Sequence, residues 1–529
     1  MSDAGAVPII KEVQTRFLYP FFFRRGALAE ARELMLKATI PSRTQEARPI
    51  WECTTAHELY KEELLRHVVK FFFSSGSNIG CEYLRINEAV GNRWFNKLEV
   101  ELLAGNRYRL RLVPTALIEL FLSSYGAGVL SLALRPETPQ GLQPSQLIDF
   151  NYRLSQFRPN TAAQLTTPHP AANVDAWANL SANQQQQVRI ASEDQASVFE
   201  RVGRPGGTLR LSELAAELVR PLEDLSFEAD QGQFAVYTVA RFGPSVDFSD
   251  ANTKHSLSYL VSALAQVEEP RHAGSPEGLT LVGNAVLNRK HWFGASMLGA
   301  AHLVADQEPL DHPFNAARMP RIMIKYFTPY LAALMQRVVL HRASEEASEL
   351  VLAPPNDAND RFVDLRTCLL EFALEGSFNE VTHRGTLHRY YRLCLDMLNV
   401  PAGLAEIRRA VADIDARNTS IRQVRIAEDL RSNAEAARAM QVRMAQHMAV
   451  VAKVQTMVEW IEIIIVSVYL AHLWDLFASH IKALEHWVSI GVVVAAVLGA
   501  LLALLILKPW RHQQHQLVES EPEQRSTRS

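Results

Sequence analysis

The chain has 529 residues, of which 48% are hydrophobic and 21% charged, and its formal net charge at pH 7 is −3. This length allows two or three domains, each with a core of its own. Because the charges nearly cancel, the composition gives no general argument for an acidic substrate or a nucleic-acid partner, and we expect no direct binding of nucleic acid.

The cysteines and the N-terminus predict a cytoplasmic domain. The four cysteines, Cys53, Cys81, Cys368 and Cys394, show neither paired spacing nor a CxxC motif. They are typical of buried, reduced thiols rather than of disulfides or zinc ligands. Residues 1–10 have no basic run followed by an apolar core, so no signal peptide is expected.

Residues 1–160 are predicted to form an N-terminal α/β cytoplasmic region. A Gly-Asn turn signal at residues 105–106 separates two strand-like runs, 99–103 and 107–113, which predicts a hairpin. The elements expected after it are strands at 116–123 and 129–134 and a helix with Ser145 as its N-cap.

Residues 161–197 change in composition to Pro, Asn, Gln, Ala and Thr, which predicts a flexible linker. Residues 198–400 then form the second part of the α/β cytoplasmic domain. Its predicted elements are strands at 233–242, 279–286 and 295–304 and helices at 323–350, 362–374 and 386–398.

A stalk helix is predicted over residues 401–456, because the chain has neither Gly nor Pro from Leu404 to Ile490. Alternating steps of four and three residues define a largely apolar stripe, here called the seam, with the period of about 3.5 residues that is typical of helices packed along one face. We therefore expect a homo-oligomer. The seam consists of Leu430, Ala434, Ala437, Gln441, Met444, Met448, Val451, Gln455, Val458, Glu462, Ile465, Tyr469, His472, Leu476 and Ser479.

Residues 457–507 are predicted to be a two-helix transmembrane hairpin that continues the stalk. The segment 487–507 is uncharged and long enough to cross a hydrocarbon layer of about 30 Å. The segment 457–477 carries Glu459, Glu462, His472 and Asp475. If both segments cross, the flanking basic residues all stay on the inner side, which predicts a multi-pass protein of the cell inner membrane with cytoplasmic N- and C-termini. If only the second crossed, the body of the protein would have to be exported. Residues 508–529 are expected to be a disordered tail.

Three groups of candidate site residues follow from this arrangement. Seam residues of a symmetric bundle form rings that can line a pore, although a closed packing seam is the alternative. The pore-lining candidates are Glu462, Ile465, Tyr469, His472, Leu476 and Ser479. The outer-mouth candidates, which could attract a divalent cation or simply form a solvated loop, are Asp475, His480, Glu485 and His486. The helix-packing candidates are the small residues Gly491, Ala495, Gly499 and Ala503.

Four strings in this order, together with the C-terminal layout, resemble divergent bacterial members of the CorA-type magnesium channel superfamily, which includes membrane effectors associated with type III CRISPR systems. The strings are SYGAGVLSL at 124–132, DFNYR at 149–153, YLAALMQR at 330–337 and FNEVT at 378–382. The resemblance implies a pentamer, a nucleotide-derived ligand and a role in phage defence. The Gly-Met-Asn triplet that ends the first span of typical members is missing, since residues 473–480 read LWDLFASH. Magnesium selectivity is therefore not implied.

The sequence thus predicts an α+β cytoplasmic domain, a long helical stalk and a C-terminal transmembrane hairpin. The corresponding function is an oligomeric cation channel or transporter gated by a ligand or an ion, and the alternative is a non-conducting, membrane-anchored sensor or scaffold. No nucleophile and base occur at a motif spacing, so we expect no enzyme. No cofactor is expected beyond a divalent cation as the permeant or regulatory ion.

Overall fold

The computed structural model describes residues 8–40, 48–73, 80–95, 98–101, 107–114, 117–137, 141–158, 161–166, 208–229, 232–270, 282–308, 310, 313–352, 355–479 and 490–501. The chain divides into a first unit, residues 1–418, and a second unit, residues 419–529. Most of the predicted linker, residues 167–197, and the predicted tail lie outside the described residues.

The first unit is built around the strand β1 (Glu12–Phe22), of which every residue after Glu12 is buried. It pairs antiparallel with β9 (Ala127–Pro136) on one side and with β13 (Ala235–Phe242) on the other. A central strand covered on both faces reads as a continuous apolar run. Pro20 is tolerated because it lies beyond Leu18, the last residue of β1 in register with β13, and before Phe21, the first to pair with β12 (Glu228–Ala229).

The mixed sheet runs in the order β11-β10-β6-β7-β9-β1-β13-β16-β15-β14, and β8, β5 and β4 branch from β9. The pair β13–β16 is parallel, whereas the other pairs are antiparallel. The remaining strands of this sheet are β4 (Trp51–Glu52), β5 (Cys81–Ile86), β6 (Glu99–Glu101), β7 (Arg107–Leu112), β8 (Ile118–Ser123), β10 (Leu165–Thr166), β11 (Thr208–Leu209), β14 (Gly283–Asn288), β15 (His291–Ala295) and β16 (Gly299–Ala305). A separate ribbon pairs β2 (Thr39–Ile40) with β3 (Arg48–Pro49).

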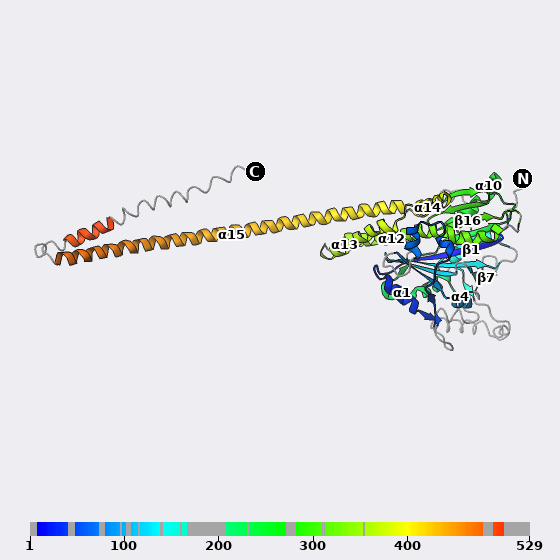
Figure 1. The fold of residues 1–529 in the computed structure, drawn as a ribbon, viewed down its shortest axis with the longest axis horizontal. Coiled ribbons are helices and arrows are strands. Elements are labelled where there is room, and N and C mark those ends of the chain that lie inside the picture. The colour runs from blue at the N-terminus through cyan, green and yellow to red at the C-terminus, as the bar shows by residue number, and fades with distance from the viewer. Residues whose placement is uncertain are drawn as a thin grey trace. The chain divides into compact units, whose positions relative to one another are not determined.

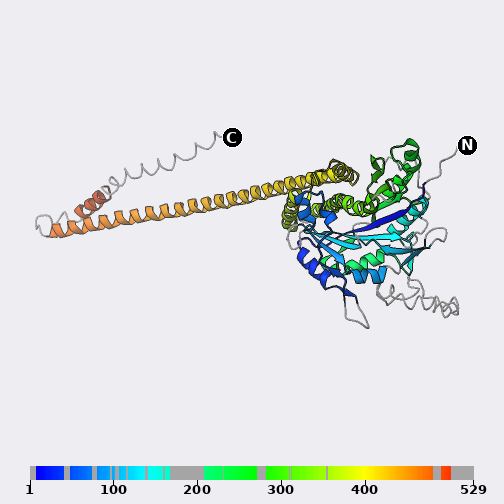
Figure 2. The same cartoon turned by 45° about the vertical axis from the view of Figure 1, so that its right-hand side comes forward.

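Helices cover both faces of the sheet and enclose two hydrophobic cores, with α12 and α14 on one side and α1 and α4 on the other (Figures 1 and 2). The helices of the first core are α1 (Leu28–Lys37), α4 (Glu88–Phe95), α5 (Pro144–Ser155), α9 (Leu211–Val219), η2 (Arg220–Leu225) and α10 (Ala251–Gln266). Those of the second core are α2 (Glu58–Lys61), α3 (Arg66–Phe73), α11 (Pro313–Arg321), η4 (Ile322–Tyr326), α12 (Phe327–Leu352), α13 (Pro355–Glu371), η5 (Phe372–Gly376) and α14 (Gly385–Met397).

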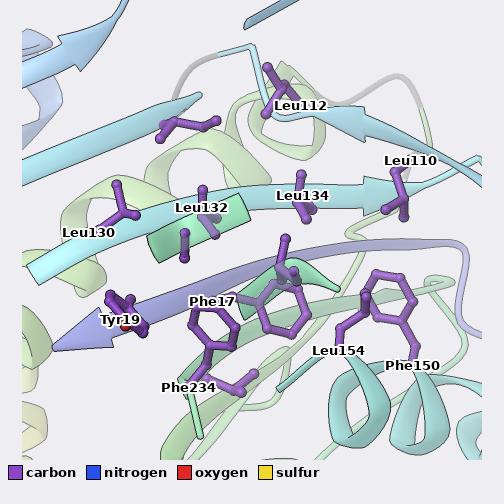
Figure 3. Packing of buried hydrophobic residues seen from close by; sticks show 14 of the residues in the cluster. Phe17, Tyr19, Leu110, Leu112, Leu130, Leu132, Leu134, Phe150, Leu154 and Phe234 are labelled. Atoms are coloured by element: carbon purple, nitrogen blue, oxygen red, sulfur yellow. The ribbon is translucent and has the colours of Figure 1, made fainter. Parts of the chain in front are cut away.

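Aromatic packing fixes β1 against α5 in the first core, as Figure 3 shows. The ring of Phe17 lies 6.0 Å from that of Phe150 and 6.1 Å from that of Phe234, in edge-on arrangements that aromatic pairs prefer. Leucines of β9, among them Leu132 and Leu134, pack in the same layer.

Most predicted elements of the first unit exist, and several boundaries change. The β-hairpin predicted for residues 99–113 is confirmed, because β6 and β7 pair antiparallel. The predicted cap is wrong: Gln143, not Ser145, caps α5, in a box closed by Gln146 with Pro144 at the first helical position. All four cysteines are free thiols, but Cys53 is exposed rather than buried.

Helix α15 (Val400–Ser479) is a single helix of 80 residues, so the predicted unbroken rod through Met457 is confirmed. Pro401 and Gly403 lie inside its first turn rather than before it, where a missing N–H is tolerated. Ile407 and Ile414 are buried in the second core of the first unit.

The predicted transmembrane hairpin is contradicted. Over the residues described, no helix is both long and apolar enough to cross a membrane. The predicted first span, 457–477, lies within α15 and carries Glu459, Glu462, His472 and Asp475. The predicted second span, 487–507, lies outside the described residues except for 490–501. The same finding overturns the assignment to the cell inner membrane as a multi-pass protein.

We predict that Gly299→Ala destabilises the first unit. A Cβ at this position in β16 would collide with the carbonyl oxygen of Val236 on β13 and lie 3.1 Å from that of Ala265. Val236 is held in the sheet and Ala265 in helix α10, so neither backbone can move freely and the free energy of unfolding should fall by about 1–3 kcal/mol. Urea unfolding followed by circular dichroism measures this change. Gly232→Ala is the control, because nothing lies within 4 Å of its added Cβ; equal midpoints for the two variants would refute the prediction.

Candidate functional site

All six predicted pore-lining residues lie on α15, at its C-terminal end. Ile465, Tyr469 and Leu476 are 48%, 71% and 55% exposed, and Glu462 and His472 are exposed as well. Spacings of three and four residues place them on one side of a helix. The structure therefore places five of the six candidates, all except Ser479, whose side chain is not described, in one exposed stripe.

The stripe continues toward the first unit along the seam. Leu430, Met444, Met448, Val451 and Val458 are all exposed large apolar residues. A monomeric protein rarely leaves so long an apolar surface in water. This uncovered seam is the first candidate functional surface of the molecule.

The helix-packing candidates lie on a short helix, residues 490–501, except for Ala503, which is outside the described residues. A Cβ at Gly491 would collide with the indole of Trp474, and one at Gly499 would lie 2.9 Å from Cδ1 of Leu470. Gly499, which follows Gly491 in the chain, faces Leu470, which precedes Trp474. The short helix 490–501 therefore runs antiparallel to the end of α15. The small residues permit this close approach.

The predicted outer-mouth group is not assembled in the part of the chain that the structure describes. Asp475 lies exposed on α15, whereas His480, Glu485 and His486 lie outside the described residues. Among the residues described, no group of three or more His, Cys, Asp or Glu could hold a metal ion. The divalent cation stays a prediction.

A buried polar cluster in the first unit was not found from the sequence. Arg16 on β1 is fully buried and donates hydrogen bonds to Glu119 on β8 at 2.5 Å, to Tyr60 at 2.7 Å and to Ser131 at 3.0 Å. Its Nε atom donates to the carbonyl oxygen of Met323 at 3.1 Å. The only sequence signal was a single arginine at the start of the apolar run of β1.

The cluster satisfies its buried charges. Burial opposes the positive charge of Arg16, but Tyr60 and Glu119 outweigh burial and raise the pKa of the guanidinium. Tyr83 donates a further hydrogen bond to Glu119 at 2.8 Å, and the guanidinium lies 3.9 Å from the ring centroid of Phe327. Removing either Arg16 or Glu119 alone would leave the other charge uncompensated, which typically costs about 3–5 kcal/mol.

The cluster also fixes the π-helical turn η4 to the sheet. Arg16 holds the carbonyl of Met323, and the hydroxyl of Tyr237 on β13 donates to the carbonyl of Ile322 at 2.8 Å. Pro329, one turn later, has no N–H to donate to the carbonyl of Lys325, which favours a departure from α-helical bonding here. Such turns are frequent at functional sites.

Two buried histidines lie beside η4. Nε2 of His291 on β15 is 3.0 Å from Nδ1 of His302 on β16, and the rings of Tyr326 and Tyr390 pack against the pair. Burial and the nearby charge of Arg318 lower the pKa of His291 to about 3. Burial, followed by His291, lowers the pKa of His302 well below its ordinary value. Both rings are therefore neutral at pH 7.

A hollow of about 680 Å³ lies beside η5 and is lined mainly by α3 and by the segment after η5. Its apolar side chains include Leu65, Phe71, Leu374 and Phe378, and its polar ones include Lys70. The volume falls in the range of small-molecule sites. The string FNEVT, one basis of the predicted resemblance, contributes Phe378 and the two residues after it.

Comparison with protein-family models, with curated proteins and with solved structures finds no match. The resemblance to the CorA-type superfamily stays a prediction.

We predict that the buried histidine pair makes stability depend on pH. The unfolded chain binds a proton at each histidine below pH about 6.5, whereas the folded chain does not until the pH approaches 3 for His291. As the pH is lowered from 6.5 to 5, the free energy of unfolding should therefore decrease, by up to about 1.4 kcal/mol per pH unit for each ring.

Denaturant unfolding at several pH values checks this dependence. The variant with His291→Gln and His302→Gln should show a shallower slope. His341→Gln, a change at an exposed position, is the control. The account of the pair would be wrong if the double variant kept the slope of the parent chain.

Proposed function

We propose that this protein is an oligomeric sensor or scaffold in which the α15 helices of several copies pack side by side along the seam. The observation that supports the proposal is the exposed apolar stripe from Leu430 to Leu476 on a single helix. Burying apolar surface is the main favourable term in protein association. The occupant we assign to the stripe is a second copy of the same stripe.

The pattern of the seam favours copies that are parallel and in register. Polar residues interrupt the apolar positions at Gln441, Gln455, Glu462 and His472. A polar residue at a packing position is tolerated when its equivalent in the neighbouring helix lies at the same level and can share a hydrogen bond, and this specifies register. The parallel arrangement places like residues together, so the amide groups of Gln441 and of Gln455 can each pair with their equivalents in the neighbouring helix.

The proposal corresponds to the alternative function given by the sequence, a non-conducting sensor or scaffold, but it does not include the membrane anchor. The channel expected from the sequence relied on a transmembrane helical hairpin, and that hairpin is contradicted over the described residues. The number of copies, and a nucleotide-derived ligand, are expectations that come only from the predicted resemblance. The sensing role is supported by the continuity of α15, whose first turns pack in the core of the first unit.

We predict that Met444→Glu combined with Val451→Glu disrupts assembly of the full chain. Each change replaces a buried apolar contact, worth about 1.5–3 kcal/mol, by a charge. The dissociation constant should rise at least about a hundredfold. Sedimentation velocity over a concentration series measures this.

The matched control is Val442→Glu combined with Ala449→Glu, which adds the same charge on a face of α15 outside the seam. The control should sediment like the parent chain. A parent chain that remains monomeric at tens of micromolar, or seam and control variants that associate equally, would overturn the proposal.

A further inference from the structure

We propose that the first unit binds a small oxyanion, inorganic phosphate or the phosphoryl group of a small phosphate ester, in the cavity beside η4. This inference is independent of assembly through α15. The cavity has a volume of about 200 Å³ and is formed where α11, η4, the start of α14 and the turn between β14 and β15 meet. Its size suits a compact anion rather than a drug-sized ligand, whose sites measure about 300–1,000 Å³.

The charge of the lining favours an anion. Four cationic side chains and one carboxylate face the cavity, and they are Arg318, Arg321, Lys325, Arg384 and Glu63. Guanidinium groups match the geometry of phosphate oxygens and bind them in pairs. Burial lowers the pKa of Arg318; the carboxylate of Asp306 opposes this shift, and the charge of Arg241 adds a smaller lowering.

A buried neutral donor reaches the same cavity. His291 is only 6% exposed and lines the cavity, while its Nε2 atom is engaged with Nδ1 of His302. Nε2 of His302 has no hydrogen-bond partner among the described residues. A buried N–H without an acceptor is rarer than an unused lone pair, so the favoured tautomer has His302 donating from Nδ1. That leaves Nδ1–H of His291 as a donor for a bound oxygen.

The start of α14 adds backbone donors. Thr386 and Leu387, in the first turn of this helix, line the cavity, and the N-cap residue Arg384 makes no capping hydrogen bond with its side chain. First-turn N–H groups and the positive end of the helix dipole favour an anion. The hydroxyl of Thr386 and the amide of Asn288 are further polar groups of the lining.

The carboxylate of Glu63 competes with a bound anion for the cationic side chains of the cavity. Its carboxylate pairs with Lys325 and, at 2.8 Å, with Arg384. Its backbone has φ 66°, a left-handed conformation that is uncommon outside glycine, and its carbonyl accepts a hydrogen bond from Thr382. Glu63 is thus held so that its carboxylate covers cations that an incoming anion would use. Removing this charge should strengthen anion binding, whereas removing Arg384 should weaken it.

Isothermal titration of the full chain with inorganic phosphate, and separately with glycerol 3-phosphate, tests the inference. We expect saturable binding of one anion per chain, an affinity that rises about tenfold in Glu63→Gln and falls about tenfold in Arg384→Gln. Arg389→Gln is the matched control, because Arg389 is on the same helix and does not line the cavity.

Stronger binding of inorganic phosphate identifies the free ion as the ligand, and stronger binding of the ester identifies a phosphorylated small molecule; either result supports the site. Acetate at the same ionic strength should not compete. The inference would be overturned if neither anion bound to the parent chain or to Glu63→Gln, or if Arg384→Gln and Arg389→Gln changed the affinity equally.

Discussion

The constraint on which the molecule depends is that α15 is one helix with two kinds of surface. Its first turns are held in the second core of the first unit, through residues such as Ile407 and Ile414. Farther along, large apolar side chains remain exposed, among them those of the seam. The same element can therefore join the α/β unit to an assembly.

Inside the first unit, the buried ion pair of Arg16 and Glu119 has a comparable role. It satisfies a charge at the centre of the sheet and holds η4 in place through the carbonyl of Met323. Lys325 of η4, together with Arg318 and Arg321 of the preceding helix, then faces the cavity beside the start of α14. A structural cluster on one side of η4 thus positions cationic groups on the other.

Periodicity predicted the elements whose side chains alternate or repeat on one face. The hairpin of β6 and β7 and the unbroken α15 are of this kind. β1 was missed because both of its faces are buried, so its apolar run has no alternation to distinguish a strand from a helix. The cap of α5 was misplaced because glutamine is an unusual capping residue. The transmembrane hairpin was wrong because apolar length was given more weight than the charges within 457–477.

Of the candidate functional surfaces, the seam could be predicted from the sequence and the cavity beside η4 could not. The seam could be predicted because its residues lie on one helix and recur at steps of four and three, which the sequence shows directly. The cavity beside η4 could not be predicted, since Glu63, His291, Arg318 and Arg384 are distant in the chain and meet only through the fold. His291 and His302 lie on adjacent antiparallel strands, so their pairing depends on the register of β15 with β16.

The most direct test of the central claim, that the seam joins copies of α15 in parallel, is a distance measured between copies. A spin label at Ala449, introduced as cysteine after exposed Cys53 is replaced by serine, reports this distance by pulsed electron paramagnetic resonance. Parallel helices in register should give one narrow distribution within about two helix diameters, about 20–25 Å. A second label at Glu435, two heptads earlier on the same side of α15, should give a similarly short distance. Long distances at both positions, or no dipolar coupling between copies, would contradict the account.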